Sequence, residues 1–226
     1  MIDINISLIV ENFFNLIKDE DVVAIDAYKY DKEIIDEIVK LIILRKKNIF
    51  FVATTNSQAR YYDQLGQRTI SLNEKEIDIA LEFVNQIDQY NNFIKKNTTS
   101  FIRDKMVSQS ALNLIVVVDK RNVVDNLDKD IYLEISSFAW QRTLINLQSY
   151  GVARIVLYKD GSYFKTEIGH YLIRLSLDSN ITLEDFEYSV RNVPGVLETG
   201  LFLGVADTLF IFDEDNKDHL ETRKRN

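Results

Sequence analysis

The stretch VPGVLETGLFLGVAD, residues 193–207, decides the fold of this chain. The 226 residues contain one proline and seven glycines, yet Pro194, Gly195, Gly200 and Gly204 all fall inside this window. Proline fixes a backbone dihedral, and glycine permits left-handed backbone and close approach of a neighbouring chain segment. The stretch therefore predicts a rigid turn with tight backbone contacts.

Composition predicts a globular protein with a substantial core, since 46% of the residues are hydrophobic. No run of eighteen uncharged apolar residues exists, so we expect neither a membrane span nor a signal peptide, and a cytoplasmic location by default. The absence of cysteine and the presence of only two histidines argue against disulfides, a metal site and thiol catalysis. The net charge of -8 argues against nucleic acid or an anionic membrane as partner. The basic end, residues 223–226, is expected to be a solvated tail.

Apolar patterns in the first half alternate between helix and strand, which is the rhythm of a parallel sheet. Helices are predicted over residues 5–18, 32–47, 54–66 and 100–112. Strands are predicted over residues 21–26, 48–54, 76–81 and 112–119. The valine- and isoleucine-rich strands are apolar on both faces, which suits a sheet covered by helices on two sides.

The pattern changes near residue 128. A strand is predicted over residues 131–136 and a helix over 138–151. A hairpin is predicted from residues 153–164 and 170–177, a second helix over 183–192 and a strand over 196–203. Residues 207–212 read as a further buried strand that returns to the first sheet. The fold class is therefore α/β, with a Rossmann-like parallel-sheet domain over 1–127 plus 205–226 and a small α+β, ferredoxin-like domain over 128–204.

In such sheets ligands bind beyond the carboxyl ends of the strands, but these turns carry little recognisable chemistry. The turn after the first strand, DAYKYD, lacks the glycines that let backbone N–H groups close on a phosphate.

Several stretches resemble the ribose-5-phosphate isomerase A family, a family of cofactor-free aldose-ketose isomerases. VPGVLETGLFLGVAD is similar to its ipGVvEtGLF signature, EIDIALEFVNQID to iDiaiDGADEvD, and NFIKKNTTSFIRDKMV to lIKGGGgaLlrEKiv. FFVATTNSQARYYDQLG, LNLIVVVDKRNVV and KDGSYFKTEIGHYLI also resemble family segments, so the likeness runs along nearly the whole chain in order. The resemblance implies the isomerase fold, a sugar phosphate as ligand, no metal or cofactor, and a homodimer or homotetramer.

The family's phosphate loop, GTGST, falls on Asp26, Ala27, Tyr28, Lys29 and Tyr30. Both glycines are replaced by other residues, and Asp26 adds a negative charge where a dianion would bind. At about 4 Å and an effective dielectric constant of roughly 20, one such repulsion is on the order of 4 kcal/mol, offset only if Lys29 turns inward. The substitutions predict that the phosphate cradle is lost.

The acid loop, DGADE, falls on residues 82–86, so that Glu82 replaces the first aspartate and the amide Asn85 replaces the second. The lysine of KGGGG is kept as Lys95 and is followed by Lys96. Glu82 and Lys95 are 13 positions apart, as in the family. An amide cannot act as a base, so only part of the acid-base set remains.

The family's general base falls on Asp104, in RDK where the family has REK, and the lysine of DeSK falls on Asn122. The resemblance thus implies Asp104 as base, Lys95 as electrophile and Glu82 for ring opening. A shorter carboxylate can still accept a proton, although a displacement of about 1 Å can cost on the order of a hundredfold in rate.

Structural roles without chemistry stay open for each of these positions. Lys95, Lys96, Arg103 and Lys105 read as a solvated helix-end patch or as a reworked anion site, and Asp104 as a surface acid paired with a neighbouring base. Tyr28 and Tyr30 are expected to fill the former pocket as core. A hairpin role is the default for the segment Glu167 to His170, and Trp140 is expected in the core or at a subunit interface.

Two classes of function follow. In the first, the chain is a ribose-5-phosphate isomerase with altered loops. In the second, the chain is a pseudoenzyme, an isomerase scaffold that has lost turnover. It would then be a noncatalytic subunit, a regulator of an active paralogue or a receptor for another ligand. Substitution concentrated at the ligand loops, with the core strands and the signature intact, favours weak or lost isomerase activity.

Overall fold

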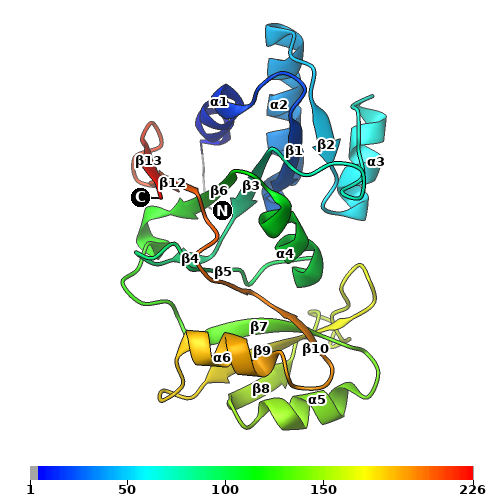
Figure 1. The fold of residues 1–226 in the computed structure, drawn as a ribbon, viewed down its shortest axis with the longest axis vertical. Helices are drawn as coiled ribbons and strands as arrows, with labels where there is room; N and C mark the ends of the chain where they lie inside the picture. Colours follow the sequence, from blue (N-terminus) through cyan, green and yellow to red (C-terminus); the bar gives the residue numbers. More distant parts are fainter. Residues whose placement is uncertain (1–4, 226) are drawn as a thin grey trace.

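The computed structural model describes residues 5–225, whose strands form three sheets (Figure 1). Residues 1–4 of the predicted first domain and Asn226 of the predicted tail lie outside the described residues. In Figure 1 a six-stranded sheet occupies the upper body, a four-stranded sheet the lower body, and a three-stranded sheet lies between them. No helix within residues 5–225 is long and apolar enough to cross a membrane.

The large sheet has the strand order β13-β12-β6-β3-β1-β2. Its strands are β1 (Val22–Asp26), β2 (Phe50–Val52), β3 (Ile79–Phe83), β6 (Leu114–Asp119), β12 (Thr208–Phe212) and β13 (Leu220–Lys224). All pairs from β2 to β12 are parallel, and only β13 runs antiparallel to its neighbour. The predicted parallel sheet, and the return of residues 207–212 to it, are confirmed.

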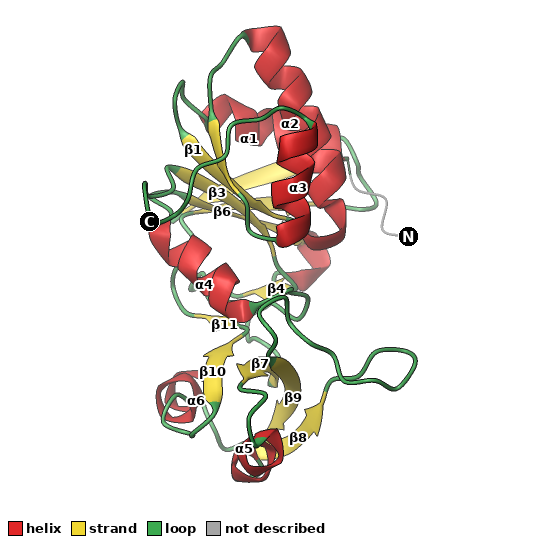
Figure 2. Ribbon diagram, turned by 90° about the vertical axis from the view of Figure 1, so that its right-hand side faces the viewer, coloured by secondary structure: helices red, strands yellow, loops and turns green. Residues whose placement is uncertain are grey.

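Helices cover both faces of this sheet (Figure 2). They are α1 (Ile6–Leu16), α2 (Asp31–Arg45), α3 (Asn56–Gln64) and α4 (Phe101–Ser110). Phe14 of α1 and Ile38 of α2 share a buried cluster with Ile25 of β1, whereas Val107 of α4 packs with Ala24 from the opposite face. Successive residues of β1 thus enter two different cores, which explains why the strand is apolar on both faces.

The small domain is built from β7 (Asp130–Ile135), α5 (Trp140–Leu147), β8 (Gly151–Ile155), β9 (Tyr171–Leu177), α6 (Leu183–Val190) and β10 (Val196–Thr199). Its sheet has the order β10-β7-β9-β8 with antiparallel pairs throughout, the ferredoxin-like arrangement that was predicted. The hairpin predicted from residues 153–164 and 170–177 is confirmed, because β8 pairs antiparallel with β9 along its whole length. The connection between them carries one further bridge, from Leu157 to Tyr163.

The glycine-rich stretch does not form the single strand predicted over residues 196–203. β10 ends at Thr199, and β11 (Leu201–Phe202) joins a separate sheet with β5 (Phe93–Ile94) and β4 (Gln86–Ile87). Gly200 lies at the switch, where its N–H donates to Tyr132 O at 2.7 Å and its carbonyl accepts from Lys95 N at 2.8 Å. A Cβ at this position would lie 2.3 Å from a backbone carbonyl oxygen, so only glycine fits.

The same stretch makes a tight turn before β10. Gly195 has a φ of +92°, and the Thr143 hydroxyl of α5 donates to the Pro194 carbonyl at 3.0 Å. Gly204, after β11, has a φ of +62°. These contacts account for the clustering of proline and glycine: the chain turns at the edge of one sheet, crosses to a second and then enters the third.

The basic end is exposed to solvent, as predicted, but it is a strand rather than a tail. Arg223 and Lys224 belong to β13, which lies against β12 with five paired positions. The apolar strand β12 would otherwise expose its edge, and β13 supplies partners for its backbone groups. The division into domains at residues 127/128 and 204/205 stays a prediction.

Candidate functional site

Four charged side chains meet near the carboxyl ends of the neighbouring strands β1 and β3. Asp26 ends β1 and lies in register with Glu82 of β3. Lys95 directly follows β5, and Asp104 lies in the first turn of α4, whose N-cap is Ser100. The parallel pairing of β1 and β3 and the start of α4 therefore bring together residues that are up to 78 positions apart in the sequence.

The Lys95 ammonium lies at the centre of this cluster. Its Nζ is 2.5 Å from Asp26 Oδ2, 2.8 Å from Glu82 Oε1 and 3.0 Å from Asp104 Oδ2. Lys95 and Glu82 are each 1% exposed, Asp104 3% and Asp26 9%. Ser108 donates to Glu82 Oε2 at 2.7 Å, and Thr98 donates to Asp104 Oδ2 at 2.6 Å. We call Asp26, Glu82, Lys95 and Asp104 the lysine-carboxylate cluster.

Burial and mutual repulsion set the protonation of the lysine-carboxylate cluster. Burial raises the pKa of Asp104 well above its usual value, and the Asp26 carboxylate raises it further. Burial likewise raises the pKa of Glu82. Burial by itself lowers the pKa of Lys95, but the Asp104, Asp26 and Glu82 carboxylates outweigh it and hold that pKa well above its usual range. Lys95 is thus an ammonium at neutral pH.

The three carboxylates also offer the oxygen ligands that a hard cation prefers, with donor atoms within 4.8 Å of one another. Lys95 Nζ lies within 3.0 Å of an oxygen of all three and therefore occupies the position between them that a cation would take. Among residues 5–225 this is the one group of acidic side chains gathered closely enough to consider.

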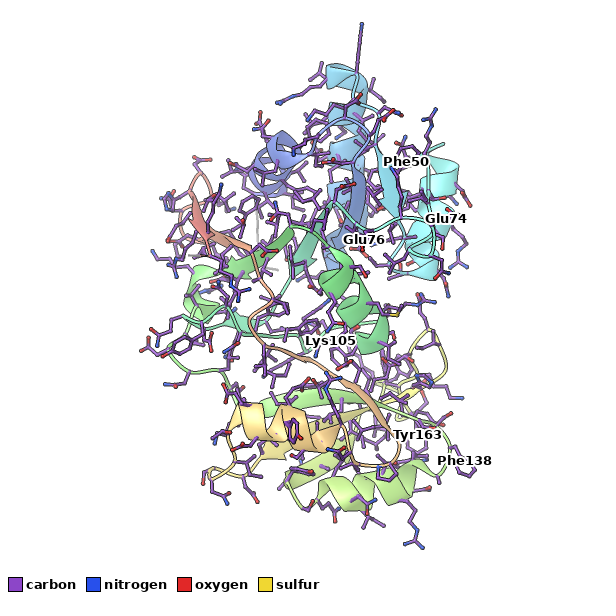
Figure 3. All side chains as sticks on the ribbon, viewed as in Figure 1. Phe50, Glu74, Glu76, Lys105, Phe138 and Tyr163 are labelled. Carbon is purple, nitrogen blue, oxygen red and sulfur yellow. The ribbon has the colours of Figure 1, made fainter. Side chains whose placement is uncertain are left out.

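The solvated patch considered for Lys95, Lys96, Arg103 and Lys105 is wrong, because both Lys95 and Lys105 are buried. Lys105 donates to Leu201 O at 2.5 Å and pairs with acids of α6 and β10, so it ties α4 to the small domain, as its place in Figure 3 shows. Lys96 pairs with Asp128 at 2.9 Å. The interpretation of Asp104 as a surface acid is also wrong, because its partner is Lys95 in the interior.

A cavity of about 160 Å³ lies above the carboxyl ends of β1, β3, β6 and β12. Six of the predicted substrate-binding residues line it: Ala27, Tyr28, Lys29, Tyr30, Asn85 and Asn122. The other two do not line it. The Asp26 side chain points to Lys95 in the lysine-carboxylate cluster. Lys96 pairs with Asp128 and Asp130.

Sequence reasoning missed Asn97, Asp119 and Phe212 as further lining residues. Asp119 and Phe212 end β6 and β12, so the rule that ligands bind beyond the carboxyl ends of strands could have indicated them. Asn97 falls on a glycine of the KGGGG segment, directly after Lys95 and Lys96, so the resemblance could have indicated it.

The aromatic residues do not fill this cavity as predicted. Tyr28 has a φ of +53° and is 52% exposed, so its assignment to the core is wrong. Tyr30 is half-buried and packs its ring 5.6 Å from that of Phe83, in the cavity wall. Lys29 does not turn inward toward Asp26; its ammonium lies 4.8 Å above the Tyr30 ring.

The N-terminus of α2 points at the cavity, but an internal carboxylate already uses it. Asp31 Oδ1 accepts from the Ala27 N–H at 2.7 Å. Burial and the charge of Asp26 raise the pKa of Asp31 to about 7. The backbone amide that would meet an anion in this loop is therefore satisfied within the chain.

The segment for which a hairpin role was expected also links the two domains. Glu167 accepts from Asn56 N at 2.8 Å and from Arg103 Nη1 at 2.8 Å, at the N-terminus of α3. His170 Nδ1 lies 2.9 Å from Glu134 Oε1. Trp140 packs against the small-domain core, edge-on to Tyr163.

The fold and the placement of the site define an α/β protein with its polar site beyond the carboxyl ends of a parallel sheet. A sequence model of the family described as "Ribose 5-phosphate isomerase A (phosphoriboisomerase A)" matches residues 50–216, and the chain belongs to this family. The match begins after residues 26–30, the segment aligned above with the phosphate loop.

Curated relatives agree with this assignment. "Ribose-5-phosphate isomerase A 1" of Oceanobacillus iheyensis is 26% identical over 167 residues, covering 73% of this chain and 75% of that protein. "Ribose-5-phosphate isomerase A" of Staphylococcus aureus strain COL is 28% identical over 192 residues, covering 83% and 84%.

Solved structures show the same fold. Ribose 5-phosphate isomerase A of Methanocaldococcus jannaschii superposes with a TM-score of 0.86 at 22% identity, and the alignment covers 98% of both chains. Ribose 5-phosphate isomerase of Plasmodium falciparum gives a TM-score of 0.87 at 19% identity, again over 98% of both chains. The predicted family and fold class are thus confirmed.

Proposed function

We propose that this chain is a ribose-5-phosphate isomerase A-type protein with weak or lost isomerase activity. The family reaction converts D-ribose 5-phosphate to D-ribulose 5-phosphate. The observation that carries the proposal is the enclosure of Lys95: its buried ammonium donates to Asp26 at 2.5 Å and to Glu82 at 2.8 Å, and it lies 3.0 Å from Asp104.

An isomerase of this kind needs a base that removes a proton from the substrate and a donor that stabilises the enediolate. A base must come within about 2.6–3.2 Å of the proton it removes. Asp104 is 3% exposed and already bonded to Thr98 and Lys95. Both groups are therefore withheld from a substrate.

Phosphate binding is weakened as well. The Ala27 amide is taken by Asp31, and Lys29 lies over an aromatic ring at the rim. Asp119 adds a carboxylate to the cavity lining, although Arg121 pairs with it. A dianion here would meet negative charge without a cluster of N–H or cationic donors.

The alternative function is a noncatalytic subunit, a regulator of an active paralogue, or a receptor for another ligand. The cavity favours the receptor. It remains accessible beside the buried lysine-carboxylate cluster, and its walls carry aromatic and amide side chains.

Conversion of D-ribose 5-phosphate by the purified chain tests the proposal. Asp104→Ala and the isosteric Asp104→Asn serve as controls against a contaminating host isomerase. We expect turnover indistinguishable from both controls. Turnover near the ordinary enzyme range of about 1 to 1,000 per second, abolished in both variants, would refute the proposal.

The family resemblance further suggests a homodimer or homotetramer in the cytoplasm. Analytical ultracentrifugation of the purified chain tests the first, and fractionation of the source cells tests the second. A monomer at micromolar concentration contradicts the expected assembly without affecting the proposal on activity.

A further inference from the structure

We propose that the 160 Å³ cavity binds a small uncharged polyhydroxylated compound, a free pentose or a polyol, and discriminates against phosphorylated sugars. The proposal rests on the receptor alternative above and specifies the chemistry of its ligand. It is argued from the charge, the amides, the aromatic walls and the size of the cavity.

The cavity wall carries one positive and one negative side chain, and both already have partners within the chain. Of the charged lining residues, Asp119 accepts three hydrogen bonds from Arg121, two of them from the guanidinium. The other, Lys29, places its ammonium over the ring of Tyr30. No cluster of free cations faces the cavity from the described residues that line it, so a phosphate gains little there.

Amide groups supply the hydrogen bonds that hydroxyl groups need. Asn85 Oδ1 accepts from the Lys96 N–H at 2.6 Å, which fixes the oxygen and leaves the Nδ2 hydrogens to donate. Asn97 and Asn122 also line the cavity, and within residues 5–225 their side chains make no hydrogen bond. Amides both donate and accept, which matches a hydroxyl better than it matches a dianion.

Aromatic rings form the remaining walls. Tyr28, Tyr30, Phe83 and Phe212 contribute apolar faces, against which the C–H groups of a sugar or polyol can pack.

The volume limits the ligand. Pockets for drug-sized ligands measure about 300–1,000 Å³. At about 160 Å³ the cavity accommodates a compound of the size of a pentose rather than a nucleotide or a disaccharide.

Isothermal titration of the full-length protein with four separate probes tests the inference: D-ribose, D-ribitol, D-ribose 5-phosphate and inorganic phosphate. We expect D-ribose or D-ribitol to bind with a Kd on the order of 1 mM, the range of a ligand with few contacts. Both phosphorylated probes should bind at least ~10-fold more weakly. The difference between D-ribose and D-ribitol then distinguishes a ring from an open chain.

Asn122→Ala removes one amide from the cavity, and Asn73→Ala, at an exposed position in a different cleft, is the matched control. We expect Asn122→Ala to weaken binding of the uncharged probe about tenfold, as for one lost hydrogen bond, and Asn73→Ala to leave it unchanged. Circular dichroism checks that both variants fold.

Tighter binding of either phosphorylated probe would overturn the inference, as would failure of both uncharged probes to bind or equal effects of the two substitutions. Failure of the uncharged probes without isomerase turnover overturns this inference alone. Tight binding of D-ribose 5-phosphate together with turnover overturns the proposed function as well.

Discussion

Replacement of Lys95 by methionine tests the central feature of this protein, the single ammonium that binds three buried carboxylates. Lys95→Met keeps most of the side-chain volume and removes the charge. Removing one partner of a buried ion pair typically costs about 3–5 kcal/mol, because the remaining charge is left uncompensated. Here three contacts of 2.5 to 3.0 Å are lost together, so we expect a loss in this range at neutral pH.

The sign of the pH dependence follows from the carboxylates. Without Lys95 the pKa values of Glu82 and Asp104, already raised by burial, rise further. A carboxyl group whose folded-state pKa is raised stabilises the fold at low pH and loses that contribution as the pH rises through the folded value. The difference in unfolding free energy between wild type and Lys95→Met should therefore be larger at pH 8 than at pH 5.

Urea denaturation followed by circular dichroism at both pH values measures this difference. Lys96→Met is the matched control, since Lys96 forms partly exposed pairs that are worth about 0–1 kcal/mol. Asp104→Asn, added to Lys95→Met, removes one uncompensated carboxyl and should restore part of the stability. A Lys95→Met protein no less stable at pH 8 than the Lys96→Met control would refute the reasoning.

Three further outcomes are expected. Gly200→Ala should destabilise the fold by about 1–3 kcal/mol or more, because its Cβ would meet a backbone carbonyl oxygen at 2.3 Å. Gly66→Ala, where no atom lies within 4 Å of the added Cβ, should cost only the ~1–2 kcal/mol of a left-handed backbone. Equal costs in urea unfolding would contradict this expectation. The wild type should lose roughly 4 kcal/mol of unfolding free energy as the pH rises from about 4 to 7, because folding raises the pKa of Asp31 from 3.8 to about 7. Asp31→Asn should flatten that loss in unfolding curves across this pH range. An unchanged slope would exclude Asp31 as its source. Arg103→Ala should change the free energy of unfolding by no more than about 1 kcal/mol but should speed amide hydrogen exchange around its partner Glu167. Unchanged exchange there would show that the Arg103–Glu167 ion pair does not hold the loop that carries Glu167.

The sequence indicated the architecture correctly because core strands carry their own signal. The apolar runs of β1 and β6 and the alternation with amphipathic helices predict a parallel sheet from local patterns alone. The break at Gly200 was missed, although the glycine itself was noticed. A glycine in a strand shows that something approaches closely, but only the folded chain shows that the Lys95 backbone is what approaches.

What the sequence determined by itself is the fold, the family resemblance and the list of charged residues at the loops: the resemblance to family segments indicated Glu82, Lys95 and Asp104. Only the tertiary structure decided how deeply these side chains are buried and which ion pairs they form. Burial and ion pairing depend on which distant side chains meet, and Asp26, 69 positions from Lys95, could not be assigned as its partner from local sequence. Because desolvation and Coulomb interactions depend on three-dimensional distance, a lysine that reads as solvated in the sequence is enclosed by three carboxylates in the fold.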